Sequence, residues 1–198
     1  MDVKPVKLIC GLIYHEIDIL REVTEVMIEN FGSIDNESDV FDFDHTDYYQ
    51  DEMGDKLTRK FVSFEKLIQP DRLAEMKTRA NQIETQFARK NNGSRGRCVN
   101  IDPGYIELSK LVLASTKNFS HRIYLDRGIY GEVTLIRKGD SFIELPWTYP
   151  DYLNPVTLEF LENVRNTYKT QLRKEVKPDI FRIPAMIFKR AKAEVSLT

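Results

Sequence analysis

Cysteines and long apolar runs are scarce in this sequence, and each scarcity excludes a class of protein. The 198 residues include only two cysteines, Cys10 and Cys98, too few for a disulfide framework or a cysteine-based zinc site. Aliphatic neighbours flank both, so we expect reduced, buried thiols. No apolar segment approaches the roughly 20 residues that cross a bilayer, and residues 1–7 lack the apolar core of a signal peptide. We therefore expect a cytoplasmic protein that does not enter the membrane.

Glycine and histidine motifs of common enzyme families are also absent. The nine glycines form neither the phosphate-binding loop Gly-x4-Gly-Lys-Ser/Thr nor the dinucleotide fingerprint Gly-x-Gly-x-x-Gly. The chain contains no Gly-x-Ser-x-Gly elbow, and its three histidines, His15, His45 and His121, leave few candidates for a catalytic triad. A function must therefore be sought outside these motifs.

Composition is that of a globular protein, with 41% hydrophobic and 30% charged residues. We expect one α+β domain over residues 1–176 and a basic C-terminal arm over 177–198. Residues 165–198 carry nine Lys/Arg against three acids, while the whole chain has a net charge of -2. The arm could dock on an acidic partner, on a second copy in a homo-oligomer, or on its own body, or it could be a loose end. Nucleic acid is a less expected partner, because the overall charge is slightly negative.

The first half of the chain alternates strands and helices. Residues 6–14 are apolar on both pleat faces, as in a central strand. A helix follows, for which Asp18 is the expected N-cap and Gly32 the expected C-terminal residue. Residues 58–67 predict a strand whose row containing Val62 and Phe64 is buried. A second amphipathic helix begins at Pro70 and places these residues along one face: Leu73, Met76, Ala80, Ile83 and Phe87.

The second half is less regular. We expect a turn at residues 102–104, after which residues 105–116 fit either a helix capped by Asp102 or a strand over 110–116, and we favour the strand. Residues 129–137 and 141–146 predict a hairpin. Asn154 and Pro155 begin the last helix as cap and first residue.

This order of elements indicates an α+β fold. Strand, helix, two strands, helix and strand fit a ferredoxin-like antiparallel sheet with helices on one face. A C-terminal hairpin, a helix and the arm would extend it.

An acidic segment is the first candidate site. Residues 35–55 hold nine acids and no lysine or arginine, and strand alternation places Asp42, Asp44 and Thr46 on one face. Residues 42–46 match the Asp-x-Asp-x-Thr motif of phosphatases with an aspartyl nucleophile, but the apolar strand that should precede the motif is missing. With Asp47, the two aspartates could instead hold Mg²⁺, Mn²⁺ or Ca²⁺. The alternative is a solvated edge strand whose charges prevent edge pairing.

A basic segment and an aromatic one follow. Lys117, His121 and Arg122 could bind a phosphate, the arginine through two hydrogen bonds and the histidine as a proton donor, or they could form a polar turn. Residues 147–152, Trp-Thr-Tyr-Pro-Asp-Tyr, could stack a base or sugar, although an aromatic cluster more often pins a loop to the core.

Several of these segments together resemble a prokaryotic family known only as domain of unknown function 4416. The resemblance covers the chain to about residue 168 and rests on these segments: 6–14, 43–54, 100–105, 120–124, 128–130 and 147–152. It implies no catalytic residues. Some similar proteins carry a GTP-binding label, although the phosphate loop of the usual guanine-nucleotide switches is absent here.

The segments combine into a functional hypothesis. We expect a small anionic ligand, a nucleotide or phosphorylated metabolite, in a cleft between the acidic strand and the His/Arg strand. The residues expected to contact it are Thr46, Tyr48, Lys117, His121, Arg122 and Tyr124. An alternative is a metal-dependent phosphoester hydrolase in which Asp44 and His121 are catalytic and Asp42, Asp44 and Asp47 hold Mg²⁺ or Mn²⁺. A second alternative is a non-catalytic interaction protein that uses its basic tail.

Overall fold

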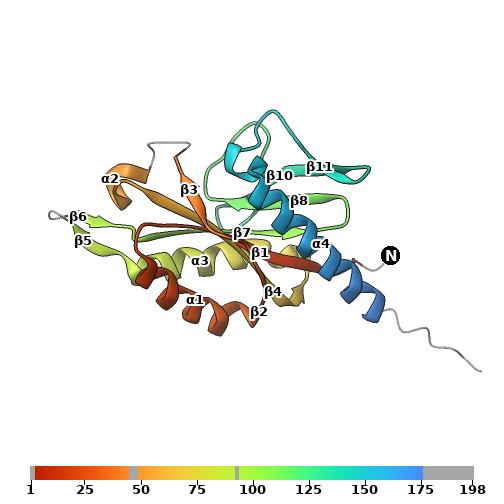
Figure 1. The fold of residues 1–198 in the computed structure, drawn as a ribbon, viewed down its shortest axis with the longest axis horizontal. Helices are drawn as coiled ribbons and strands as arrows, with labels where there is room; N and C mark the ends of the chain where they lie inside the picture. Colours follow the sequence, from red (N-terminus) through yellow and green to blue (C-terminus); the bar gives the residue numbers. More distant parts are fainter. Residues whose placement is uncertain (1–2, 45–48, 92–93, 176–198) are drawn as a thin grey trace, which may run out of the picture.

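A nine-stranded antiparallel sheet forms the centre of the computed structural model, which describes residues 3–44, 49–91 and 94–175 (Figure 1). Seven strands lie in the order β11-β10-β8-β7-β1-β4-β2, while β3 pairs with β4 and β9 pairs with β10. Their bounds, in chain order, are β1 Val6–Tyr14, β2 Ile34–Glu37, β3 Phe41–Phe43, β4 Leu57–Ile68, β7 Val99–Ile106, β8 Lys110–Ser115, β9 Ile123–Asp126, β10 Ile129–Lys138 and β11 Ser141–Glu144. A separate hairpin consists of β5 Arg89–Asn91 and β6 Ser94–Gly96.

Helices cover both faces of the sheet. Helix α1 (Ile17–Phe31) and helix α3 (Leu73–Phe87), which follows the 3₁₀ turn η2 (Pro70–Arg72), lie on one face, and helix α4 (Pro155–Glu175) lies across the other (Figure 1). Short elements α2 (Gln50–Met53) and η3 (Pro150–Leu153) precede β4 and α4. The α+β class is thus confirmed. The ferredoxin-like arrangement stays a prediction. No described helix is long and apolar enough to span a membrane.

The two-sided covering explains which strand residues are buried. All nine residues of β1 are buried, as predicted for a central strand: Leu8, Cys10 and Leu12 join the core under α1 and α3, and Ile9 joins the core under α4. The prediction that only one row of β4 is buried was incomplete. Phe61, on the opposite row from Val62, is also fully buried because α4 covers that face.

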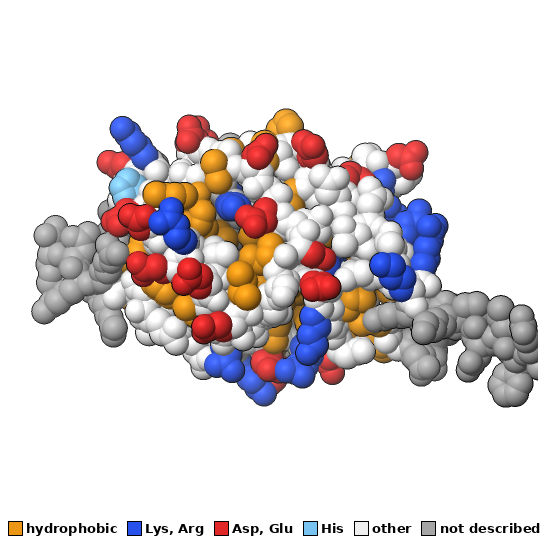
Figure 2. All heavy atoms as spheres, turned by 60° about the horizontal axis from the view of Figure 1, so that its bottom comes forward, with side chains coloured by type: hydrophobic (Ala, Val, Ile, Leu, Met, Phe, Trp, Pro, Cys, Tyr) orange, Lys and Arg blue, Asp and Glu red, His pale blue; other side chains and the backbone are white. Residues whose placement is uncertain are grey.

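The side that α1 and α3 cover is strongly charged at its surface. In Figure 2, which brings this side forward, acidic side chains are frequent over the left half with a few lysines and arginines among them, and further lysines and arginines lie toward the lower and right margins. Four exposed acids of α1 recur at helical spacing: Asp18, Glu22, Glu25 and Glu29. The predicted basic arm, residues 177–198, lies outside the described residues, so its docking on an acidic face stays a prediction.

Helix caps follow local sequence in two of three predicted cases. The helix predicted from Pro70 begins there as the 3₁₀ turn η2 and continues as α3 from Leu73. Gly32 has φ 99° and donates its N–H to Ile28 O at 2.9 Å, as expected of a helix C-terminus. The predicted cap at Asp18 is wrong, because α1 already begins at Ile17 and has no side-chain cap. Asn154 caps α4, since its Oδ1 accepts the N–H of Val156 at 2.9 Å.

The Asn154 cap supports a quantitative prediction. Asn154→Ala should lower the free energy of unfolding by about 1 kcal/mol, because a helix N–H loses its acceptor. Asn154→Asp keeps an acceptor oxygen and should retain most of the stability. Urea denaturation of the three proteins measures the difference. Equal losses in both variants would show that the hydrogen bond is not the source of the effect.

Strands β7 and β8 correct one prediction and confirm another. Residues 110–115 form a strand, as favoured, but residues 102–104 lie inside β7 instead of forming a turn. The pairing of β7 with β8 runs from Ile106–Leu111 to Gly104–Leu113 and ends there. Pro103 follows on β7 and has no N–H to donate. The predicted hairpin of β10 and β11 is confirmed.

Candidate functional site

A cavity of about 590 Å³ lies where β7 and β8 cease to pair. Asn100 and Asp102 line it from β7, while residues 113–117 line it from the end of β8 and the loop that follows. Helix α3 contributes polar residues, and η3 with the preceding Tyr149 contributes another wall. The cavity therefore lies in the space between β7 and β8 beyond the end of their hydrogen-bonded pairing.

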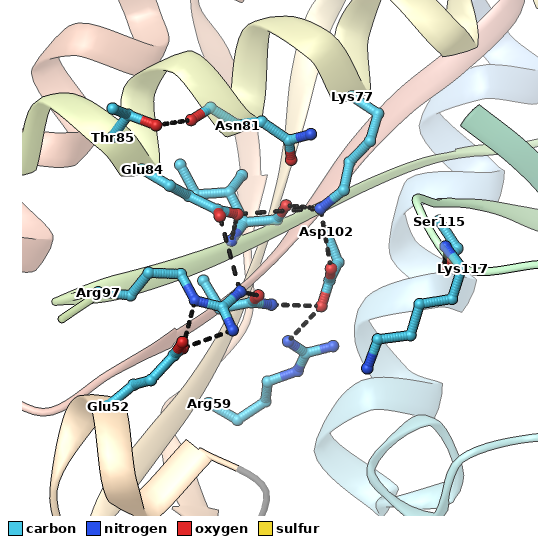
Figure 3. A network of polar contacts seen from close by, with 12 residues as sticks. Glu52, Arg59, Lys77, Asn81, Glu84, Thr85, Arg97, Asp102, Ser115 and Lys117 are labelled. Carbon is cyan, nitrogen blue, oxygen red and sulfur yellow. Dashed lines mark hydrogen bonds and ion pairs between the residues drawn. The ribbon is translucent and has the colours of Figure 1, made fainter. Parts of the chain in front are cut away.

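Charged side chains dominate the lining. Five are cationic: Arg59, Lys77, Arg97, Lys117 and Arg122. Four are carboxylates: Glu84, Asp102, Glu132 and Asp151. The cavity thus has one more cationic than anionic group, and most of these groups contact one another (Figure 3).

Arg59 on β4 is the most deeply buried of the cations, with 1% of its surface exposed. Its Nη2 donates to the hydroxyl of Tyr152 at 3.0 Å, and its Nε lies 3.0 Å from Asp151 Oδ2. Among the described residues neither Nε nor Nη1 makes a hydrogen bond, so these nitrogens interact with Asp151 and, at 3.6 Å, with Asp102 as ion pairs. Burial alone would lower the pKa of Arg59, but the Asp151 carboxylate raises it above its ordinary value. The guanidinium is therefore held charged inside the protein.

Gly11 on β1 makes room for Arg59. A Cβ atom at this position would lie 2.7 Å from Arg59 Nη2 and 2.9 Å from the ring of Phe61. The same ring stacks with the guanidinium at 4.5 Å from its centroid. Glycine is needed here for close approach, not for backbone conformation.

Helix α3 brings a lysine and a glutamate to the cavity (Figure 3). Lys77 Nζ donates to Ile101 O at 2.7 Å and to Asp102 Oδ1 at 3.3 Å. Burial tends to raise the pKa of Asp102, but Lys77 and Arg59 outweigh it and lower that pKa. Glu84 Oε1 accepts the N–H of Ile101 at 2.7 Å, and burial raises the pKa of Glu84. The two neighbouring carboxyls therefore differ in how readily they take a proton.

Arg97, between β6 and β7, closes another side. Its Nε and Nη2 lie 2.7 and 2.6 Å from Glu52 Oε2, and its Nη1 donates to Asn100 Oδ1 at 3.0 Å. The guanidinium also lies over the ring of Tyr49, 5.5 Å from its centroid. These contacts attach α2 to the start of β7.

The predicted basic segment lies partly in this cavity. Arg122 donates to Glu132 at 2.8 Å, to Ser115 Oγ at 3.0 Å and to Tyr149 OH at 3.3 Å. His121 Nε2 lies 3.0 Å from the same Glu132 oxygen. Lys117 and Arg122 line the cavity, whereas His121 reaches it only through Glu132.

The predicted acidic strand contributes an aromatic side chain to the cavity lining, but neither of its described aspartates. Asp42 and Asp44 are exposed and do not line the cavity, although Phe43 between them does. Tyr124 is 57% exposed and packs against Tyr130. Thr46, Asp47 and Tyr48 lie outside the described residues. In the basic segment, Arg122 and His121 both pair with the buried Glu132 of β10.

The aromatic segment pins its loop to the sheet. Trp147 Nε1 donates to Val133 O at 2.8 Å, and its ring stacks on His121 at 4.8 Å between centroids. Tyr149 and Tyr152 line the cavity. This agrees with the structural interpretation favoured from the sequence.

Metal binding remains a prediction. Within the described ranges, no group of three or more His, Cys, Asp or Glu side chains is placed to hold a metal ion. One predicted ligand, Asp47, is not among the described residues, so the site proposed at Asp42, Asp44 and Asp47 is untested.

Sequence reasoning missed most of the cavity. It did not propose these charged residues as part of a site: Arg59, Lys77, Glu84, Arg97, Asp102 and Glu132. One signal was present, because Lys77, Asn81 and Glu84 recur at spacings of four and three beside the predicted core stripe of α3. A polar row of this kind next to an apolar one indicates a helix face that lines a polar space.

One comparison with known proteins gives a match. The sequence model of a family described as "Domain of unknown function (DUF4416)" matches residues 4–168. No curated protein and no solved structure matches the chain. Five of the segments that carry the resemblance contribute to the cavity: Ile13, Phe43 and Tyr49, Asn100 and Asp102, Arg122, and Tyr149 to Tyr152.

Proposed function

Because the chain belongs to the DUF4416 family, whose description names no activity, we propose its function from the cavity: it binds a small anionic ligand, either a nucleotide or a phosphorylated metabolite. The observation that carries the proposal is the gathering of five cationic side chains around one space from four separate parts of the chain. Arginine and lysine are the side chains that recognise phosphate groups.

Size and wall chemistry support the same ligand class. A volume of about 590 Å³ lies within the range of small-molecule sites, roughly 300–1,000 Å³. Phe43, Tyr49 and Tyr149 supply flat apolar surface on which a base or sugar can pack. In this proposal Lys117 and Arg122 contact the anion, and His121 supports Arg122 through their shared Glu132.

Thermal denaturation tests the proposal. A panel of nucleotides, sugar phosphates and inorganic phosphate, each with and without Mg²⁺ or Mn²⁺, should contain a compound that raises the melting temperature. A ligand at about 100 times its Kd stabilises the folded state by about 2.7 kcal/mol. If no phosphate compound stabilises the protein, the proposal is wrong.

A substitution of Lys117 tests whether this lysine contacts the anion. Lys117→Gln removes an exposed cation at the cavity while keeping most of the side-chain length. Affinity for the stabilising phosphate compound should fall about tenfold, since one charge-assisted contact is lost. The melting temperature without ligand should change little, because the contacts of an exposed lysine contribute at most about 1 kcal/mol.

Lys138→Gln is the control. This lysine is exposed in the β10–β11 hairpin and does not line the cavity. Its replacement removes the same charge from the molecule, so equal losses of affinity in both variants would indicate a general charge effect instead of a contact in the cavity.

A further inference from the structure

Glu84 is the least firmly paired carboxylate of the cavity. Its nearest cationic nitrogens, Lys77 Nζ and Arg97 Nη1, both lie at 3.8 Å, beyond hydrogen-bonding distance. The other three carboxylates each have a cationic nitrogen at 3.3 Å or less: Asp102, Glu132 and Asp151. Only 8% of the Glu84 side chain is exposed, and it lines the cavity, so its carboxylate is mostly buried and faces the space where a ligand would lie.

The two cations nearest to Glu84 form shorter contacts with other acceptors. Lys77, from the same helix, donates to Asp102 and to a backbone carbonyl. Arg97, from the segment before β7, is held by Glu52. From β7, Ile101 offers its N–H to Glu84 Oε1. The second oxygen, Oε2, has no hydrogen bond among the described residues.

We propose that Glu84 takes up a proton from solvent when the anion enters the cavity, and that the resulting Oε2–H donates a hydrogen bond to the anion. This inference rests on the proposed function. The bond between the proton and Oε2 forms as a hydronium ion or buffer acid in the solvent gives up that proton, and no bond breaks within the protein.

Charge balance in the cavity explains why the proton is needed. The lining has one more cation than carboxylates, so a dianion would leave an excess negative charge beside carboxylates that are themselves mostly buried, among them Glu84, Glu132 and Asp151. Protonation of Glu84 cancels one negative charge and also turns an acceptor that would repel the anion into a donor. The raised pKa of Glu84 and the lowered pKa of Asp102 agree with this choice of carboxyl.

Sulfate is a suitable probe, because it stays a dianion across the pH range in which Glu84 titrates. We expect isothermal titration calorimetry of the wild-type protein, in two buffers of different ionisation enthalpy, to report uptake of up to one proton per sulfate bound. Affinity should fall with increasing pH, approaching tenfold per pH unit above the pKa of Glu84.

Glu84→Gln separates this mechanism from a general pH effect. The amide keeps an oxygen acceptor for the Ile101 N–H and a donor toward the anion, but it cannot titrate. Its affinity for sulfate should not vary with pH, and binding should take up no proton. Glu144→Gln, at an exposed carboxylate of β11, should behave as wild type.

Each outcome decides between the two proposals. Failure of wild-type protein to bind sulfate or any phosphate compound contradicts the proposed function as a whole. Binding without proton uptake retains that function and overturns the role of Glu84. Proton uptake that persists in Glu84→Gln assigns the titration to another group, and the wild-type calorimetry stays decisive even where the variant fails to fold.

Discussion

Replacing Arg59 by methionine should lower the free energy of unfolding by about 3–5 kcal/mol, the largest effect that we expect from a single substitution. The guanidinium is 1% exposed and lies between Asp151 at 3.0 Å and Asp102 at 3.6 Å. Methionine fills much of the same space, but Asp151, only 6% exposed, loses its cation. The cost therefore comes from an uncompensated buried carboxylate, not from a cavity.

A double variant tests this explanation. Arg59→Met combined with Asp151→Asn removes both partners of the pair and should recover about 1–2 kcal/mol of the loss. Urea denaturation near neutral pH measures the three variants of the cycle against the wild-type protein. No recovery in the double variant would mean that Arg59 stabilises the protein through its packing on Phe61 and Tyr152 instead of its charge.

Arg21→Met is the control for the loss of an arginine as such. Arg21 pairs with Asp18 on α1 at 3.5 Å, and both side chains are more than 70% exposed. The expected change is below about 1 kcal/mol, because water screens an exposed pair.

Lys7→Met should lower the free energy of unfolding by about 3 kcal/mol near neutral pH. Lys7 is fully buried on β1, contacts Asp35 of β2 and donates to Gln171 Oε1 of α4 at 3.0 Å. Burial lowers the pKa of Lys7, so its positive charge depends on Asp35. Asp35 is 19% exposed, which places the expected loss at the lower end of the range for buried pairs.

The loss in Lys7→Met should depend on pH with a definite sign. Burial alone would raise the pKa of Asp35, but hydrogen bonds from Lys7 and Ser63 outweigh it and hold that pKa below its ordinary 3.8. Asp35 therefore contributes stability above pH 3.8 that is lost as the pH falls through its folded-state pKa. The variant lacks most of this contribution, so wild type and variant should converge in acid.

Denaturation curves from neutral pH to about pH 3 measure this convergence. Lys4→Met, at an exposed lysine of the same segment, should show neither the loss nor the pH dependence. A wild-type advantage that stays constant down to acid pH would contradict a role for the Asp35 charge.

The elements that the sequence predicted correctly depend on local chemistry. Strand 6–14 could be predicted from a run that is apolar on both pleat faces except at Lys7, and the end of α1 at Gly32 from the positive φ that glycine allows. The start of α4 follows from Asn154 and Pro155, and the β10–β11 hairpin from its turn residues. The alternation in β4 did not predict that Phe61 is buried, because its burial depends on α4, which covers that face of the sheet.

The sequence predicted that the basic segment would pair with carboxylates, but it did not predict which carboxylate. The sequence showed that the basic segment around Arg122 needs carboxylates, and the acidic strand was the nearest dense source. The structure supplies Glu132 instead, because β10 pairs with β8 and brings Glu132 opposite Leu113, two residues before Ser115. Electrostatic attraction has little directional preference, so only the order of strands in the sheet decides which charges meet.

By itself, then, the sequence determined the α+β class, most of the elements and the presence of a cluster of cations after β8, since each depends on residues close together in the chain. Only the tertiary structure decided where the cavity lies and that Arg59 and Asp151 meet in it, 92 positions apart. The physical reason is that such a space arises from the end of the β7–β8 ladder and from layers packed above and below it. No residue carries a local signal of a partner that lies on another strand.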